Sequence, residues 1–273
     1  MSAAAERYGV IGNPVAHSKS PDIHAAFARQ TQQALSYERL LAPLDGFAST
    51  VRNLTGQGFK GANVTVPFKL EAFALADALS ERAKAAGAVN TLKFEGGRIA
   101  GDNTDGVGLV TDIMVNAGVA MRGKRILLLG AGGAARGVVL PILAESPEQL
   151  VIANRTESKA AELAAQFSGK GIVKASDFPS LQGRFDVIIN ATSASLSADL
   201  PPVPAGAFGE GCLAYDMMYG PAPTVFMTFA QQHGAATRDG LGMLVEQAAE
   251  SFHVWRGVRP DTRTVYADLR SKL

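Results

Sequence analysis

The chain has 273 residues, of which 47% are hydrophobic and 19% are charged, and its formal net charge at pH 7 is +1. This composition is typical of a globular protein of about two domains, and it excludes a disordered chain. Because the charges nearly cancel, no field of one sign favours a nucleic acid or an anionic membrane as a partner, and we expect neither.

The cysteine content and the N-terminal segment indicate a compartment. Cys212 is the only cysteine, so no intramolecular disulfide can form, as is usual for proteins of a reducing compartment. Its apolar surroundings predict a buried structural residue. Residues 1–7 have no basic segment followed by a long apolar one, so we expect no secretory signal there. These features together predict a cytoplasmic protein.

The first half of the chain alternates short apolar runs with amphipathic stretches. These patterns predict strands at 8–12, 37–41 and 61–66 and helices at 21–33 and 44–54. Two further runs, at 89–94 and 98–101, flank the pair Gly96-Gly97 and predict a β-hairpin. A helical pattern then begins at Asp105 and ends at Gly118, a residue type that often follows helices.

The second half is more regular. Its patterns predict strands at 125–129, 149–153, 171–174, 185–190 and 212–216 and helices at 134–144, 157–167, 222–233 and 241–256. Strands separated by helices of this length pair in parallel through right-handed crossovers. The sequence therefore predicts an α/β protein whose second half is a doubly wound sheet.

A glycine-rich turn follows the predicted strand at 125–129 and opens a predicted helix. A strand, a tight glycine turn and a helix N-terminus together form a pyrophosphate site, because glycine lets the backbone approach the phosphates and the helix offers free N–H groups. The turn therefore predicts dinucleotide binding, with a purely structural turn as the alternative. The residues concerned are Gly130, Ala131, Gly132, Gly133 and Ala134.

The end of the next predicted strand indicates which dinucleotide is bound. Enzymes that use NAD carry an acidic residue there, which binds the ribose 2′-hydroxyl. This chain has Asn154, Arg155 and Thr156 instead, followed by Lys159. A guanidinium can bind a phosphate through two hydrogen bonds, so Arg155 and Lys159 favour the 2′-phosphate of NADP. Two alternatives stay open: a basic helix N-terminus that only faces solvent, and partial cancellation of the Arg155 charge by Glu157.

Asn190 and Thr192 follow the predicted strand at 185–190. Polar side chains beyond the carboxyl end of a parallel strand lie along the ligand crevice, so both are candidates to contact the dinucleotide, with loop capping as the alternative. The histidines, by contrast, have no metal-ligand spacing with cysteine or carboxylate partners, and we predict no metal site.

A set of short motifs runs in order along nearly the whole chain. They are HSKSP at 17–21, NVTVPFK at 63–69, GAVNT at 87–91, GDNTDG at 101–106, the glycine turn, NRT at 154–156, NATS at 190–193 and GLGMLVEQ at 240–247. In these motifs the chain resembles the shikimate dehydrogenases, the NADP-dependent oxidoreductases of aromatic amino-acid biosynthesis. One such motif indicates little, whereas the ordered set is specific.

The resemblance implies a reversible reduction of 3-dehydroshikimate to shikimate by hydride from NADPH. It assigns Lys69 as the general acid and base and Asp105 as its partner, which orients the lysine and binds a substrate hydroxyl. A positioned proton donor suits the alkoxide that develops at the reduced carbonyl. The resemblance also implies substrate contacts from Ser18, Ser20, Asn63, Thr65, Asn90, Tyr219 and Gln247, and dinucleotide contacts from Glu81, Met217 and Gly240.

The expected organisation has two domains. Residues 1–105 and 243–273 form a discontinuous α/β substrate domain, and residues 106–242 form a Rossmann NADP-binding domain. We expect a monomer or homodimer with small-molecule partners. One alternative is a quinate/shikimate dehydrogenase of relaxed substrate and cofactor choice; such enzymes tend to carry an acid where Arg155 and Lys159 stand. Another is a catalytically silent ligand-sensing homologue, which the intact Lys69 and Asp105 disfavour.

Overall fold

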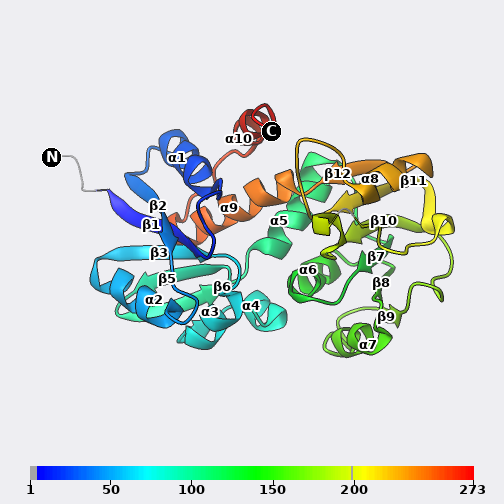
Figure 1. The fold of residues 1–273 in the computed structure, drawn as a ribbon, viewed down its shortest axis with the longest axis horizontal. Coiled ribbons are helices and arrows are strands. Elements are labelled where there is room, and N and C mark those ends of the chain that lie inside the picture. Colours follow the sequence, from blue (N-terminus) through cyan, green and yellow to red (C-terminus); the bar gives the residue numbers. More distant parts are fainter. Residues whose placement is uncertain (1–4, 198) are drawn as a thin grey trace. The chain divides into compact units, whose positions relative to one another are not determined.

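The computed structural model describes residues 5–197 and 199–273 (Figure 1). Residues 1–4, part of the segment in which we predicted no secretory signal, lie outside the described residues. The chain divides into two compact units, which we call unit 1 (up to Gly108, and Val245–Ser271) and unit 2 (Leu109–Leu244 with the last two residues). The sequence places the domain boundaries after residues 105 and 242, and these boundaries stay a prediction.

Unit 1 is built on a mixed sheet whose strand order is β2-β1-β3-β5-β6-β4. Strand β1 pairs in parallel with β2 and β3, whereas β5 is antiparallel to β3 and β6. The predicted hairpin at Gly96-Gly97 is confirmed as the β5–β6 connection, where both glycines have positive φ. The strands are β1 (Glu6–Gly12), β2 (Leu35–Leu41), β3 (Phe59–Val64), β4 (Ala78–Leu79), β5 (Thr91–Glu95) and β6 (Arg98–Asp102).

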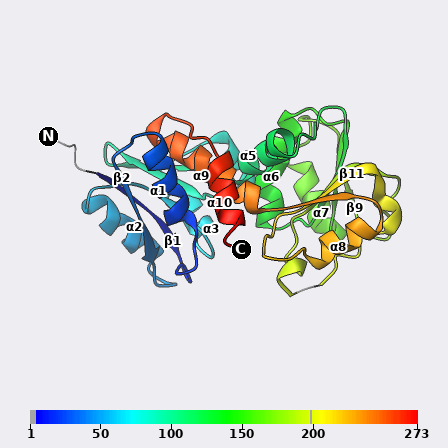
Figure 2. The same ribbon diagram turned by 90° about the horizontal axis from the view of Figure 1, so that it is seen from above.

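Helices pack on both faces of this sheet (Figure 2). Residues of α2, α3 and α4 share a buried core with β1, β3 and β5. On the other face, Phe27 of α1 packs edge-on against Phe252 of α9, with ring centroids 5.9 Å apart. The helices of unit 1 are α1 (Ser20–Gln30), α2 (Phe47–Gly56), α3 (Lys69–Leu75), α4 (Glu81–Ala86) and α10 (Arg263–Arg270). The start of α5 (Asp105–Thr111) and most of α9 (Leu241–Arg256) also belong to unit 1, and the rest of both helices belongs to unit 2.

Several predicted boundaries in unit 1 were wrong for local reasons. The helix predicted to reach residue 33 ends at Gln30, and Gln32 has a left-handed φ of 54°. The strand predicted to reach Val66 ends at Val64, because Phe68 N–H closes a turn onto the Thr65 carbonyl at 3.0 Å. The short elements α3, β4, α4 and α10 were not predicted.

Unit 2 contains a fully parallel sheet in the order β12-β11-β10-β7-β8-β9, which confirms the predicted doubly wound fold. In the central strand β7, residues on alternate faces such as Leu127 and Leu128 are all fully buried, as expected where helices cover both faces. The strands are β7 (Arg125–Leu129), β8 (Gln149–Ala153), β9 (Val173–Ser176), β10 (Phe185–Asn190), β11 (Phe208–Asp216) and β12 (Ala236–Asp239).

The helices of unit 2 are α6 (Gly133–Ala144), α7 (Glu157–Ala165) and α8 (Val225–Gln232), with single 3₁₀ turns at Ala194–Ser197 and Ala205–Ala207. The helix predicted from 105 to 118 is α-helical only as far as Thr111 and continues as a π-helical turn, Asp112–Asn116. Strand β12 was missed because its sequence, ATRD, has no apolar run. Across residues 5–197 and 199–273, the helices are all too short or too polar to span a membrane.

Candidate active site

A polar cluster of unit 1 pairs Lys69 with Asp105. Lys69 is the first residue of α3 and Asp105 the first residue of α5. Lys69 Nζ donates to Asp105 Oδ2 at 2.6 Å, and the two side chains are 32% and 20% exposed. The ammonium is therefore held in one direction by a carboxylate and still reaches solvent, as a group that exchanges a proton with a ligand must.

Asn90 fixes the other oxygen of that carboxylate. Its Nδ2 donates to Asp105 Oδ1 at 2.8 Å and to Thr104 Oγ1 at 2.9 Å, and its Oδ1 accepts from the Thr104 N–H and the Thr91 hydroxyl. Asn90 is only 3% exposed. Since both ends of its amide are engaged, Asn90 orients Asp105 within the protein. Gln247, from α9, approaches the same amide at 3.4 Å.

Asn63 lies behind Asn90 in the same network. Its Nδ2 is within 3.0–3.2 Å of the Asn90 carbonyl, the Thr91 hydroxyl and the Ser251 hydroxyl. Its Oδ1 accepts from Tyr37 at 2.7 Å. Thr91 and Thr104 belong to the motifs GAVNT and GDNTDG of the sequence analysis. Tyr37 and Ser251 belong to none of the motifs, and the sequence did not predict their part in this network.

The remaining predicted substrate residues of unit 1 lie at the start of α1 and just beyond β3. The Ser18 hydroxyl donates to Ser20 Oγ at 3.2 Å. Arg39 holds the Ser18 carbonyl through Nε at 3.0 Å and Nη2 at 2.7 Å, which secures the loop that carries the serines. Thr65 is half-buried at the turn that precedes α3. The structure thus places Ser18, Ser20, Asn63, Thr65, Asn90 and Gln247 in the same unit as Lys69 and Asp105.

The glycine turn of unit 2 has the properties of a phosphate cradle. Gly130 has φ of 104°, a conformation that side chains rarely adopt. Apart from the adjoining backbone, no atom of residues 5–197 and 199–273 lies within 4 Å of a Cβ built on Gly132 or Gly133, so packing does not require glycine there. The first intrahelical bond of α6 runs from Arg136 N–H to the Gly132 carbonyl. The N–H groups of residues 133–135 precede that bond and point out of the helix end, so the residues present fit a pyrophosphate.

The basic residues after β8 are exposed. Asn154 Nδ2 donates to the Thr156 carbonyl at 2.8 Å, which closes the turn that leads into α7. Arg155, Glu157 and Lys159 are all exposed, and in the part of the chain that the structure describes neither cation forms an ion pair. Arg155 and Lys159 thus remain available to an anionic ligand, and within the described residues Glu157 forms no ion pair with either.

The loops after β10 and β11 are joined through Asp216, a fully buried carboxylate that the sequence did not single out. Asp216 accepts from Ser195, Thr224 and Asn190 and from the Met218 N–H at 2.6–3.2 Å. Asn190 is also fully buried, and its Oδ1 accepts from Thr192. The Asn190 amide therefore shapes this loop.

Three other residues that were predicted to contact a ligand, Gly240, Tyr219 and Glu81, have clear interactions within the protein. A Cβ on Gly240 would stand 2.2 Å from the Met217 carbonyl oxygen, so close packing alone requires a glycine there. Burial raises the pKa of Tyr219, with the nearby Asp239 charge adding to the rise. Glu81 is exposed in unit 1 and pairs with Lys84 at 2.8 Å.

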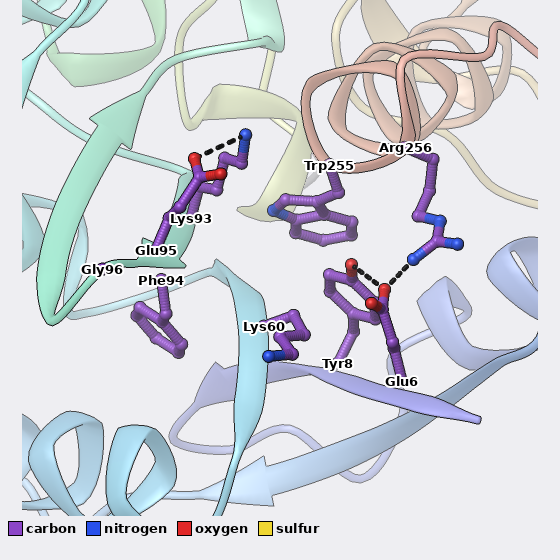
Figure 3. Close-up of a pocket in the computed structure, with 9 residues that line it drawn as sticks. All are labelled: Glu6, Tyr8, Lys60, Lys93, Phe94, Glu95, Gly96, Trp255 and Arg256. Atoms are coloured by element: carbon purple, nitrogen blue, oxygen red, sulfur yellow. Dashed lines mark hydrogen bonds and ion pairs between the residues drawn. The ribbon is translucent and has the colours of Figure 1, made fainter. Parts of the chain in front are cut away.

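A cavity of about 310 Å³ lies at the other end of the unit 1 sheet (Figure 3). Its lining includes Glu6 at the start of β1 and Lys60 near the start of β3, whereas the predicted substrate residues follow the carboxyl ends of these strands. Arg256 pairs with Glu6, and Lys93 pairs with Glu95 at 3.0 Å. Because most of its charges are already paired, we do not assign the substrate to this cavity.

Known proteins resemble this chain along its whole length. The model of the shikimate dehydrogenase substrate binding domain matches residues 10–92, that of shikimate / quinate 5-dehydrogenase matches 114–198, and that of the shikimate 5′-dehydrogenase C-terminal domain matches 240–270. The chain is 65% identical to a shikimate dehydrogenase (NADP(+)) of Janthinobacterium sp. (strain Marseille), with all of both chains covered. The chain belongs to the shikimate dehydrogenase family.

Solved structures of similar proteins share the fold of this chain. An Ael1 enzyme from Pseudomonas putida is 51% identical with a TM-score of 0.93, over 97% of this chain and 98% of that one. A shikimate 5-dehydrogenase from Thermus thermophilus, in complex with NADP(H) and shikimate, is 32% identical with a TM-score of 0.84, over 98% and 100% of the two chains. This chain therefore has the fold of the shikimate dehydrogenase family.

The family match does not reach every candidate residue equally. Lys69 and the glycine turn lie inside matched ranges, whereas Asp105, Met217 and Tyr219 lie between them. For Asp105, the direct support for a place in the candidate site is its hydrogen bond from Lys69.

Proposed function

We infer that this chain catalyses the reversible, NADP-dependent reduction of 3-dehydroshikimate to shikimate. Full-length identity of 65% to an NADP-dependent shikimate dehydrogenase supports the reaction. The single structural observation that carries the proposal is the 2.6 Å bond between Lys69 and Asp105, a proton donor held by a carboxylate in the unit that matches the substrate-binding domain.

Lys69 is proposed to supply the proton. When bound, NADPH supplies a hydride to the substrate carbonyl, and the alkoxide that develops there needs a proton. Lys69 Nζ donates that proton in the reduction direction and accepts it in the oxidation direction. Asp105 keeps the ammonium oriented through Oδ2, and Asn90 holds Asp105 through Oδ1. A carboxylate fixed at both oxygens does not need to reorganise during the reaction.

Substrate binding is proposed to begin at Ser18 and Ser20. These hydroxyls lie at the start of α1, whose first N–H groups carry partial positive charge, and both features favour a carboxylate. Thr65 and Gln247 offer neutral partners for the ring hydroxyls. Asn63 supports the site from behind, because its amide is engaged within the protein. We keep Tyr219, a residue of unit 2, as a proposed substrate contact.

Cofactor binding is proposed for unit 2. The N–H groups at Gly133 and Ala134 would hold the pyrophosphate, and Arg155 with Lys159 would hold the 2′-phosphate. Thr156, which precedes the first turn of α7, lies between these cations in the sequence. Glu81, Asn190, Thr192, Met217 and Gly240 remain proposed contacts, with Asn190 acting through the shape of its loop.

The proposal extends to location and assembly. Cys212 is buried and free, and burial raises the pKa of its thiol to about 11, so it is an inert structural thiol. A reducing, cytoplasmic location suits such a protein. We propose a monomer or homodimer, which light scattering on the purified protein decides.

Initial rates test the proposed function. We expect oxidation of shikimate with NADP to be the fastest of the four combinations of shikimate or quinate with NADP or NAD. Comparable rates with quinate would instead favour a relaxed quinate/shikimate dehydrogenase. No turnover of any combination by the folded protein, together with tight shikimate binding, would favour a ligand-sensing homologue.

A further inference from the structure

Asp216 is a buried carboxylate that takes no part in the proposed proton transfer. It is the last residue of β11 and lies opposite Asn190, the last residue of β10, in the parallel register. Within residues 5–197 and 199–273, Asp216 forms no salt bridge. A buried carboxylate without a cationic partner has to be stabilised by hydrogen bonds, so its donors show which parts of the protein it holds.

Four donors reach this carboxylate from two segments of unit 2. On the β10 side, the Ser195 hydroxyl donates to Oδ2 at 2.6 Å and Asn190 Nδ2 donates to the same oxygen at 3.2 Å. On the β11 side, the Thr224 hydroxyl donates to Oδ2 at 2.7 Å and the Met218 N–H donates to Oδ1 at 3.0 Å. Asp216 therefore joins the segment that follows β10 to the segment that follows β11.

Ser195 completes the network on the β10 side. It belongs to the 3₁₀ turn Ala194–Ser197, and its hydroxyl accepts from Asn190 Nδ2 at 3.1 Å while it donates to Asp216. The Asn190 amide cannot turn over, because its Oδ1 accepts from the Thr192 N–H at 3.1 Å and a backbone N–H can only donate. The Ser195 hydroxyl thus fastens the turn to the ends of both strands.

The order of the sheet indicates which half of the dinucleotide these loops would meet. The strands run β12-β11-β10-β7-β8-β9, the glycine turn follows β7, and Arg155 follows β8. With the pyrophosphate at the glycine turn and the adenosine 2′-phosphate beyond β8, the other half of an extended dinucleotide lies beyond β10 and β11. The nicotinamide half would therefore meet the loops joined at Asp216, which also carry the proposed contacts Thr192 and Met217.

We propose that Asp216 and Ser195 are positioning residues, which hold the loops after β10 and β11 in the shape that binds the nicotinamide half of NADP. The proposal rests on the proposed function. Neither residue takes part in the proton transfer, and neither contacts the adenosine half of the cofactor. Loss of the network should therefore weaken binding of the whole dinucleotide and leave binding of its adenosine half unchanged.

Ser195→Ala tests the proposal, because it removes one hydroxyl and leaves the buried carboxylate its donors from Asn190, Thr224 and Met218. We expect the Kd for NADP, measured by calorimetric titration, to rise about 3- to 10-fold, the size of one lost hydrogen bond. Adenosine 2′,5′-bisphosphate is the probe for the other half, since it carries the 2′-phosphate and lacks the nicotinamide. Its Kd should change by less than about 2-fold.

Ser197→Ala is the matched control. Ser197 lies in the same 3₁₀ turn, but it is exposed, and its hydroxyl donates to the Ala194 carbonyl at 3.1 Å and to Asp199 at 2.7 Å. Both alanine variants should show similar thermal unfolding, and only Ser195→Ala should raise the Kd for NADP.

Asp216→Asn gives a second measurement. The amide keeps the shape of the side chain, but its NH₂ group must face either Asn190 Nδ2 or the Met218 N–H, and neither can accept. We expect a larger rise in the Kd for NADP than in Ser195→Ala, again with an unchanged Kd for the bisphosphate. If Asp216→Asn is poorly folded, the milder Ser195→Ala variant decides the question.

Two results would overturn the proposal while the proposed function stood. An unchanged Kd for NADP in a folded Ser195→Ala protein would show that the loops keep their shape without the hydroxyl. An equal rise in the Kd for NADP and for the bisphosphate would show that the variant disturbs the whole of unit 2. Failure of the unmodified enzyme to oxidise shikimate would instead refute the proposed function, because the titrations do not depend on turnover.

Discussion

Lys69 Nζ and Asp105 Oδ2 lie 2.6 Å apart, although 36 positions separate the two residues in the chain. Each is the first residue of a helix, α3 and α5, so each side chain leaves a rigid element at a defined point. We therefore expect the two residues to work together, and we expect replacement of each to change the kinetic constants in a different way.

Lys69→Ala should lower kcat for shikimate oxidation by roughly 10²–10⁴-fold, the usual contribution of a positioned acid-base group. The KM for shikimate should change much less, because the lost interaction belongs to the transition state. Lys60→Ala is the control, since Lys60 is an exposed lysine of the same unit. Near-normal kcat in a folded Lys69→Ala enzyme at neutral pH would show that the proton comes from another group.

Asp105→Asn should lower kcat and also raise the KM for shikimate. The amide keeps the shape of the side chain but presents only one acceptor oxygen, so the bonds from Lys69 and from Asn90 can no longer both form. Steady-state rates at several shikimate concentrations separate the two effects. An unchanged KM would mean that Asp105 only orients Lys69 and does not bind a substrate hydroxyl.

Arg155→Ala should raise the KM for NADP far more than the KM for NAD. The difference should correspond to roughly 1.5–3 kcal/mol of lost charged hydrogen bonding to the 2′-phosphate. Arg122→Ala, at another exposed arginine of unit 2, serves as the control. An unaltered ratio of NADP to NAD efficiency would contradict the assignment of the 2′-phosphate to Arg155.

Replacement of both Ser18 and Ser20 by Ala should weaken shikimate binding and leave NADP affinity intact. The serine hydroxyls are proposed to hold the carboxylate, whereas the dinucleotide residues lie in unit 2. Calorimetric titration of each ligand checks this without relying on turnover. Normal shikimate affinity in the double variant would place the carboxylate elsewhere.

His24 should make the stability of the fold sensitive to acid. It is fully buried, and burial lowers its pKa from 6.5 to about 3. Between these values the unfolded chain binds a proton that the folded chain does not. The stabilising contribution is therefore complete above pH 6.5 and is lost as the pH falls toward 3, with a slope of up to about 1.4 kcal/mol per pH unit.

Denaturant unfolding from pH 7 to pH 4 measures this slope. His24→Leu should flatten it relative to the unmodified chain, whereas His253→Gln, at an exposed histidine of α9, should not. Parallel curves for His24→Leu and the unmodified protein would show that His24 is protonated in the fold.

The doubly wound unit was predictable because its signals are local. The inner strands β7, β8 and β10 of unit 2 are largely buried on both faces and read as nearly continuous apolar runs, as RILLL does in β7. The glycine turn is equally local, since Gly130 needs its positive φ whatever surrounds it. Short elements such as β4 and α4 were missed because two or six residues carry too little periodicity.

The sequence by itself determined most of the strands and helices of unit 2, the glycine turn that follows β7 and, through its motifs, the residues proposed for the site. Only the tertiary structure decided which partners those residues contact. Tyr37 and Asn63 meet because β2 and β3 flank β1, and a polar residue shows no sign in the sequence of the partner that strand pairing will bring to it. Asp216 is the same case, since its buried carboxylate becomes a junction only where the loops after β10 and β11 converge on it. Apolar patterns are repeated along an element and can be read from one chain segment, whereas a hydrogen bond between distant residues depends on a register that the whole sheet sets.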